Sequence, residues 1–260
     1  AILQSTESSR TALNQNGFIL SMNKTKKPAD RLIFHVDVNS AFLSWESARR
    51  MKEGLPDLRD IPACIGGDPA KRTGIVVAKS IPAKKCGVQT GEPVAMALRK
   101  CPNMVIVPSD FDLYVKCSRA FKKICASYTP VMESFSIDEV FLDMTGTSLL
   151  YPDPIAAAHE IKDRISDELG FTVNVGISTN KLLAKMASDF EKPNKVHTLF
   201  PEEIPAKMWP LPVRELLFLG KASEKKLTEA GIRTIGDLAH AWETDIQTLI
   251  GNKNGHQLYQ

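Results

Sequence analysis

Two apolar, strand-like segments of this chain carry acidic side chains in their interior. Residues 31–38 read RLIFHVDV, with Asp37 near the end, and residues 133–144 read ESFSIDEVFLDM, with Asp138 and Glu139 side by side. A carboxylate inside an apolar segment costs free energy unless it is hydrated or neutralised. A fold built on these strands must therefore bring the three acids to a hydrated site or to a cation.

Three acids near the ends of neighbouring strands predict a site for Mg²⁺. This ion prefers hard oxygen ligands and commonly takes one or two carboxylates together with phosphate oxygens and water. Two such ions can activate an attacking hydroxyl and stabilise a leaving phosphate. Adjacent strand residues point to opposite faces, so Asp138 and Glu139 can share a site only at a turn, a bulge or a strand end. The alternative is that Glu139 faces solvent.

Apolar periodicity predicts that strands and helices alternate along the chain. The strand at residues 31–38 leads directly into a helix that Asn39 or Ser40 can cap. That helix ends at Gly54. Further strands are expected at residues 74–79, 104–107, 133–144 and 171–178, and helices at residues 41–53, 111–128, 155–169 and 180–190. This order predicts an α+β fold in which helices cover a sheet.

Composition places the chain among ordinary globular proteins. It has 260 residues, of which 43% are hydrophobic and 24% are charged, and this excludes disorder over most of its length. No apolar run is long enough for a membrane span and no secretion signal opens the chain, so we expect a cytoplasmic protein without a membrane anchor. Residues 1–30 are polar and aperiodic, which predicts a disordered leader or an extension added in cloning.

Cysteines and net charge identify no partner by themselves. The five cysteines are odd in number and include no C-x-x-C pair, which predicts free thiols in a reducing compartment. The formal net charge is only +3. Basic side chains gather in residues 71–100 and 116–123, and charge alone favours a solvated face over a nucleic-acid groove. Nothing in the sequence requires more than a monomer.

Five motifs in a fixed order carry a family resemblance. They are HVDVNSAF (35–42), AKSIPAKKCGVQTGEP (78–93), SIDEVFLD (136–143), VNVGISTNKLLAKMASDFEKPN (173–194) and GIRTIGDLA (231–239). In this order and spacing the chain resembles the Y-family translesion DNA polymerases of the DNA polymerase IV group. The SIDE motif combined with VGIS-x-NKLLAK-x-AS is highly specific, whereas the single aspartate of HVDV alone would be weak.

The resemblance implies a polymerase palm, an inserted fingers module and an all-helical thumb with a helix-hairpin-helix motif. The palm would comprise residues 31–40 and 109–190, with a mixed or antiparallel sheet and helices on one face. The fingers would comprise residues 41–108 and the thumb residues 191–260. Family members continue into a little-finger domain that grips DNA, about 100 residues at typical domain size. We therefore expect a truncated form without that domain, and any peptide that binds a sliding clamp is expected in the missing part.

Catalytic roles follow from the same resemblance. Asp37, Asp138 and Glu139 match the acids that bind two Mg²⁺ ions in the family, and the carbonyl of Val38 matches a further ligand. Phe42 matches a bulky side chain that acts as a steric gate against the ribose 2′-hydroxyl. Without the resemblance, Phe42 would be read as a core residue of an amphipathic helix.

Nucleotide contacts are implied at four positions. Lys84 and Lys185 match the cations that bind the triphosphate, and Ser40 and Ala41 stand where an aromatic pair often precedes the gate. Lys84 replaces the usual arginine, and a point charge binds phosphate differently from a bidentate fork. A common tyrosine is replaced by Ile81. The alternative for Lys185 is a solvated lysine on an exposed helix face.

DNA contacts are implied in the thumb hairpin, at Gly220 and Lys221. Phe218 stands where the first hairpin glycine usually lies, which argues against close approach of the backbone to a phosphate there.

The predicted function is DNA-directed DNA polymerisation of the translesion type, in DNA repair. A primer 3′-hydroxyl would attack the α-phosphate of a dNTP on a primed DNA template, with Mg²⁺ held by the acids. One alternative is a non-catalytic DNA-binding or recruitment protein of the same fold. A nucleotide cyclase also uses paired acids, but it would not need the thumb motif GIRTIGDLA.

Overall fold

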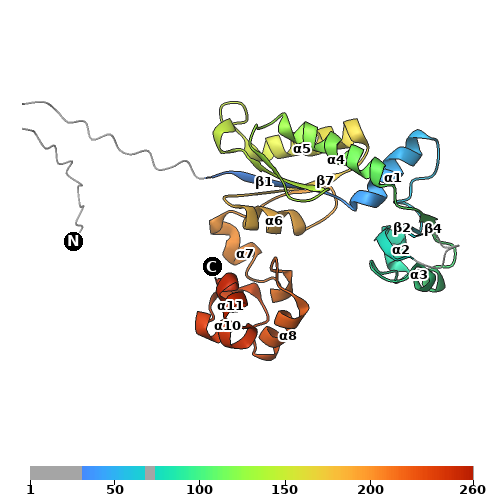
Figure 1. The fold of residues 1–260 in the computed structure, drawn as a ribbon. Coiled ribbons are helices and arrows are strands. Elements are labelled where there is room, and N and C mark those ends of the chain that lie inside the picture. Colours follow the sequence, from blue (N-terminus) through green and yellow to red (C-terminus); the bar gives the residue numbers. More distant parts are fainter. Residues whose placement is uncertain (1–30, 68–73, 260) are drawn as a thin grey trace, which may run out of the picture. The chain divides into compact units, whose positions relative to one another are not determined.

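A five-stranded sheet organises the larger part of the chain (Figure 1). The computed structural model describes residues 31–67 and 74–259, so the expected leader at residues 1–30 lies outside the described residues. In the order along the sheet, the strands are β5 (Met132–Ser134), β6 (Glu139–Asp143), β1 (Ile33–Val38), β7 (Val173–Ser178) and β8 (Val196–Thr198). β1 pairs antiparallel with both neighbours, whereas β7 and β8 are parallel. The expected mixed sheet of an α+β fold is confirmed.

Helices cover the two faces of this sheet differently. The helices are α1 (Ala41–Lys52), α4 (Phe111–Ala126), α5 (Pro154–Leu169) and α6 (Lys181–Asp189). Phe34, Val36 and Val38 of β1 pack into the main apolar core with side chains of α1, α4 and α5. Because side chains alternate along a strand, His35 and Asp37 lie on the opposite face, where α6 packs. Figure 1 shows α4 and α5 on one side of the sheet and α6 on the other, so α6 adds a partial second layer to the one that the resemblance implies.

Close packing of α6 against β7 depends on Gly176. A Cβ atom at this position would lie 2.0 Å from the carbonyl oxygen of Ala184 and 2.5 Å from the backbone nitrogen of Ser188. No side chain fits at that separation. The absence of a side chain at Gly176 therefore lets α6 pack directly against the backbone of β7.

Residues 63–67 and 74–107 form a second, smaller sheet with two short helices. Its elements are β2 (Ala63–Gly66), β3 (Val76–Lys79), β4 (Val105–Val107), α2 (Ile81–Lys85) and α3 (Val94–Lys100). The strand order is β3-β2-β4, with β2 antiparallel to β3 and parallel to β4. Val76, Ala83, Ala97 and two cysteines build a separate apolar cluster within this module.

Short helices follow the large sheet to the end of the described chain. They are α7 (Ile204–Lys207), α8 (Lys221–Glu229), α9 (Ile235–Ala239), α10 (Glu243–Ile250) and α11 (Asn252–Tyr259). One apolar cluster joins Leu183 and Met186 of α6 to Met208 and Ile235. Over residues 31–67 and 74–259, no helix is long and apolar enough to cross a membrane.

Two local expectations from the sequence are wrong. The single strand expected at residues 133–144 is two antiparallel strands, because the backbone N–H groups of Phe135 and Ser136 donate to the carbonyl of Glu139 and close a turn. The capping of α1 also differs. Ser40 occupies the N-cap position with a left-handed φ of 47° and makes no side-chain cap, while the Asn39 amide bonds to Asn174 of β7.

Candidate active site

The three acids meet at one end of β1 and β6. Asp37 and Glu139 are direct cross-strand partners in the antiparallel register, so both side chains lie on the α6 face of the sheet. Asp138 lies in the bend that precedes β6, and its carbonyl accepts a hydrogen bond of 3.0 Å from the backbone N–H of Val38. The acidic pair thus occupies a strand end, which is one of the geometries that allows adjacent residues to share a site.

Ser136 ties the acidic pair together. Its hydroxyl oxygen lies 2.6 Å from Oδ1 of Asp138 and 3.1 Å from Oε2 of Glu139. Because both carboxylates contact the same hydroxyl, the side chains of Asp138 and Glu139 lie on the same side of the chain. Sequence reasoning assigned no role to Ser136, although its place at the start of the SIDE motif was a signal.

Two lysines neutralise the acids from the neighbouring helix and the loop after it. Lys185 of α6 forms an ion pair with Glu139, and Lys192 forms one with Asp37. Lys192 also pairs with Asp189, with 2.8 Å between Nζ and Oδ1. The sequence analysis predicted Lys185 but missed Lys192, whose signal was its place in the KPN segment at the end of the long motif.

Burial disfavours the ionised form of Asp37 unless a cation is nearby. The pKa of Asp37 is raised to about 6, chiefly by desolvation and to a smaller extent by the charges of Glu139 and Asp138, while Lys192 opposes the shift. A carboxylate in this position gains from any additional positive charge. Its environment therefore favours the binding of a cation.

The donor set fits Mg²⁺ in its chemistry. Asp37, Asp138 and Glu139 supply hard oxygen atoms from adjoining backbone positions, which suits a small divalent ion. In the residues that the structure describes, no group of three or more histidine, cysteine or acidic side chains already has the geometry of a metal site. Lysine ammonium groups and the Ser136 hydroxyl contact the carboxylates instead.

His35 lies next to Glu139 on the same face of the sheet. The ring is fully buried, its Nδ1 lies 2.8 Å from the Ser188 hydroxyl, and its Nε2 lies 3.6 Å from Oε1 of Glu139. Burial, together with Lys185 and Lys192, lowers the pKa of His35 to about 3. The ring therefore stays neutral, and its Nε2 adjoins Glu139 without forming a hydrogen bond. The sequence analysis did not identify this residue.

A cleft of about 540 Å³ adjoins the acids and contains five of the predicted site residues. These lining residues are Ser40, Ala41, Phe42, Lys84 and Asp138. Lys79 and Lys192 also line the cleft, so this space borders one acid and three lysines. The structure thus brings the predicted gate, one predicted phosphate-binding lysine and one acid into a common cavity, while Asp37, Glu139 and Lys185 lie outside its lining.

Aromatic stacking holds Phe42 at the side of this cleft. Its ring stacks on Tyr114 of α4, with centroids 4.6 Å apart and an interplanar angle of 26°. Trp45 and Phe111 make edge contacts with the Phe42 ring at 5.8 and 6.3 Å. Phe42 is half-buried. It is therefore both part of the core of α1 and α4 and part of the cleft wall, so the two interpretations of this residue are compatible.

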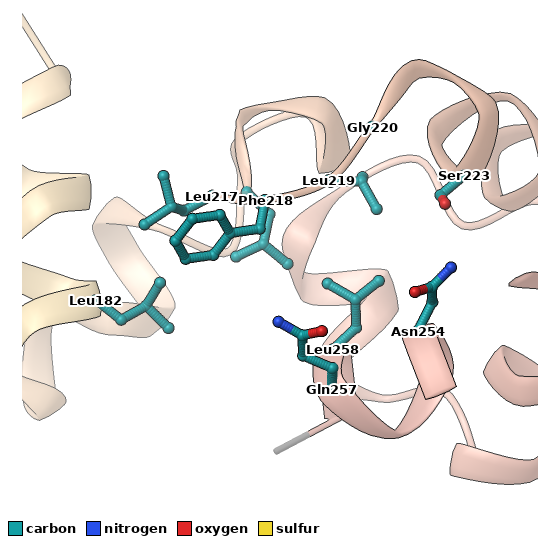
Figure 2. Close-up of a pocket in the computed structure, with 10 residues that line it drawn as sticks. Leu182, Leu217, Phe218, Leu219, Gly220, Ser223, Asn254, Gln257 and Leu258 are labelled. Atoms are coloured by element: carbon teal, nitrogen blue, oxygen red, sulfur yellow. The ribbon is translucent and has the colours of Figure 1, made fainter. Parts of the chain in front are cut away.

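The predicted DNA-contacting residues lie at the start of α8, beside a second pocket. Gly220 is the N-cap of α8, and a Cβ atom there would meet nothing within 4 Å. Phe218 is 71% exposed and has a left-handed φ of 69°, a conformation that glycine adopts more readily. The pocket, of about 310 Å³, is mainly apolar, and Figure 2 shows the Phe218 side chain extending toward Leu182 of α6. The hairpin thus keeps the backbone shape of a glycine-containing turn.

Sequence comparison identifies the family of this chain. Residues 36–189, which include all three acids and Lys185, match the profile of the impB/mucB/samB family. The chain belongs to this family. Residues 218–260 match a second profile, described as the thumb domain of DNA polymerase iota. The family resemblance predicted from the motifs is confirmed.

Curated relatives of this impB/mucB/samB member are DNA polymerases. DNA polymerase IV of Clostridium acetobutylicum is 52% identical over 210 residues, which cover 80% of this chain and 53% of the relative. DNA polymerase IV 1 of Bacillus subtilis is 42% identical over 221 residues, which cover 85% of this chain and 52% of the relative. The chain therefore spans about half the length of the curated relatives it matches.

Solved structures show the same fold. The crystal structure of DinB from Sulfolobus solfataricus matches with a TM-score of 0.77 at 25% identity, covering 87% of this chain and 65% of the other. A Y-family DNA polymerase chimera, Dbh-Dpo4-Dbh, matches with a TM-score of 0.79 over the same shares. An insertion ternary complex of Dbh DNA polymerase also matches, with a TM-score of 0.77. The fold of this family member is that of Y-family polymerases.

Proposed function

We propose that this protein is a DNA-directed DNA polymerase of the translesion type that acts on primed DNA and deoxynucleoside triphosphates. The observation that carries the proposal is the placement of Asp37 opposite Glu139, with Asp138 adjoining a cleft that Phe42 and Lys84 also line. The relatives named DNA polymerase IV support this chemistry. Such a protein would contribute to DNA repair and would act in the cytoplasm of a bacterial cell.

Asp37, Asp138 and Glu139 would hold two Mg²⁺ ions, with the carbonyl of Val38 as a further ligand. Bound Mg²⁺ would supply Lewis-acid stabilisation of the phosphates and activation of the primer hydroxyl. The chain's own residues would prepare that site. Ser136 orients the acidic pair.

The cleft would hold the incoming nucleotide. Lys84 lines it, and Lys185 forms an ion pair with Glu139, the residue after the cleft-lining Asp138, so both ammonium groups would pair with triphosphate oxygens. Ser40 and Ala41, which form part of the cleft wall, would contact the nucleotide directly. The Phe42 ring would exclude a ribose 2′-hydroxyl, because its stacking on Tyr114 limits its retreat.

We propose a division into palm, fingers and thumb that follows the two sheets and the terminal helices. Residues 31–40 and 109–190 would form the palm, residues 41–108 the fingers and residues 191–260 the thumb. Separate apolar clusters in the smaller sheet module and among the C-terminal helices support this division. In the thumb, Gly220 and Lys221 would contact DNA phosphates, since the N-cap is open and Lys221 is exposed.

Single-nucleotide primer extension tests the proposal. The chain and its Asp138→Ala variant are compared at low salt, where phosphate contacts are strongest, with Mg²⁺ and one dNTP. Extension by the parent and none by the variant is expected, with the same thermal melting for both. Metal-dependent extension by Asp138→Ala would contradict the assignment of the acids.

The same samples separate the alternative functions. Formation of a cyclic nucleotide without primer extension would identify a cyclase. Binding of primed DNA without incorporation by the parent would favour the non-catalytic DNA-binding protein.

A further inference from the structure

Two thiols face each other in the smaller sheet module, outside the nucleotide cleft. Cys86 is the C-cap of α2 and Cys101 is the C-cap of α3, and their Sγ atoms lie 3.2 Å apart. Cys86 is exposed, whereas Cys101 is buried, with 5% of its surface accessible. One sulfur of the pair is therefore open to a small oxidant and the other is held directly behind it.

Backbone hydrogen bonds fix the positions from which the two side chains project. The N–H of Cys86 donates to the carbonyl of Ala83 at 3.1 Å, and the N–H of Cys101 donates to that of Ala97 at 2.9 Å. Lys100 then joins the two helix ends, because its Nζ donates to the carbonyl of Gly87 at 3.0 Å. The backbone positions of the two cysteines thus bring the thiols together without a covalent bond between them.

We propose that Cys86 and Cys101 are a modification site that forms an intramolecular disulfide when a peroxide oxidises the exposed thiol. A disulfide needs a sulfur separation of about 2.05 Å, so the two atoms must approach by about 1.2 Å. Side-chain rotation supplies a movement of that size. This inference does not rest on the proposed polymerase function.

The reaction has two steps. The Cys86 thiolate attacks one oxygen of hydrogen peroxide, which gives a sulfenic acid on Cys86 and releases hydroxide. The Cys101 sulfur then attacks the sulfenic sulfur, the S–O bond breaks, and the oxygen leaves as water with the proton of Cys101. Each thiol loses one hydrogen, and the peroxide is reduced to two molecules of water.

The other cysteines have environments that disfavour this reaction. Burial raises the pKa of Cys64 to about 11 and that of Cys125 to about 12, and it also raises the pKa of Cys117. Reaction with peroxide requires the thiolate, so these side chains react slowly. The hydrogen bond with Cys86 raises the pKa of Cys101. Because Cys86 is the exposed member of the pair, a peroxide reaches its sulfur first.

The disulfide would form close to Lys84, a residue that lines the nucleotide cleft. Lys84 lies two positions before Cys86 on the same short helix and lines the cleft. A covalent link would join the end of α2 to the end of α3. Oxidation would therefore restrict the helix that carries Lys84.

Peptide mapping of the full chain tests the proposal. The protein is treated with hydrogen peroxide, free thiols are alkylated after denaturation, and the digest is analysed without reduction. Trypsin cleaves after Lys85, Arg99, Lys100 and Lys116, so the two cysteines fall in separate peptides, 86–99 and 101–116. A linked pair of these peptides, two hydrogen atoms lighter than their sum, is expected. A reductant should restore both alkylated peptides.

Two variants make the test specific. Cys86→Ser changes an exposed side chain and should fold, and it should abolish the linked peptide. Cys117→Ser is the matched control on α4, and it should leave the linked peptide unchanged. Recovery of Cys86 as a sulfinic acid with Cys101 still alkylated would overturn the proposal, as would a link between Cys101 and Cys64. An unoxidised Cys86 in the parent would also overturn it.

Discussion

Asp37 of β1 and Glu139 of β6 are direct partners in an antiparallel register, and each carboxylate forms an ion pair with a different lysine. Two acids on neighbouring strands of one sheet face would repel each other without these cations. Lys192 and Lys185 therefore hold the acidic face together in the described structure. Binding of a divalent ion would have to replace part of this lysine charge.

Replacement of Asp37 by asparagine should separate activity from stability. Asp37→Asn removes a metal ligand, so Mg²⁺-dependent primer extension should be lost. The free energy of unfolding should stay equal or rise, because burial already disfavours the charged form of this side chain. Primer extension and denaturant unfolding measure the two effects. A variant that is both inactive and unfolded would contradict the expectation.

Metal binding should weaken as the pH falls through about 6. The pKa of Asp37 is raised from 3.8 to about 6 in the folded protein, so protons compete with the metal for this carboxylate below that pH. Calorimetric titration with Mg²⁺ on either side of pH 6 measures the effect. The loss should be present in the parent and smaller in Asp37→Asn. A parent affinity that stays constant across this range would exclude Asp37 as a ligand.

Lys185 and Lys181 provide a matched pair for the phosphate-binding role. Lys185 is 12% exposed and pairs with Glu139, whereas Lys181 is 47% exposed and pairs with Glu133. Lys185→Ala should raise the KM for the nucleotide by about 10-fold or more, the typical worth of a hydrogen bond to a charged group. Lys181→Ala should change the KM little. Equal effects of both substitutions would favour the solvated-lysine interpretation.

The gate role of Phe42 can be tested against a neighbouring ring. Phe42→Ala should increase ribonucleotide incorporation relative to deoxynucleotide incorporation, because it opens the cleft wall. Phe111→Ala is the control, since Phe111 contacts the same Tyr114 ring at 5.6 Å but does not line the cleft. Steady-state incorporation of matched ribo- and deoxynucleotides gives the ratio. An unchanged ratio in Phe42→Ala would leave this residue a core side chain only.

Substitution of Gly176 should disrupt the packing of α6. Gly176→Ala places a methyl group 2.0 Å from the carbonyl oxygen of Ala184, so α6 must move or the strand must shift. We expect a loss of at least about 3 kcal/mol in the free energy of unfolding, as in severe overpacking. Gly146→Ala is the control, because a Cβ atom there meets nothing within 4 Å. Denaturant unfolding of both variants measures the difference.

Local sequence patterns determined most of the secondary structure and the identity of the acids. The apolar segments around Asp37 and Val175 became the central strands β1 and β7, because their side chains bury on both faces of the sheet. Periodic apolar residues gave α4, which begins at Phe111 as predicted. The motifs also identified Asp138 and Glu139, since a carboxylate is unusual next to an apolar strand.

Tertiary structure decided how those residues meet. The turn at Phe135 and Ser136 splits one apolar segment into two strands, and a pattern of hydrophobicity does not reveal where such a turn forms. Lys192 contacts Asp37 because the loop after α6 packs on the same face of the sheet, and His35 approaches Glu139 because β1 pairs with β6. Such contacts join residues more than a hundred positions apart. The contact of Lys192 also depends on the close approach of α6 that Gly176 permits, which is a property of the packed molecule and not of any local segment.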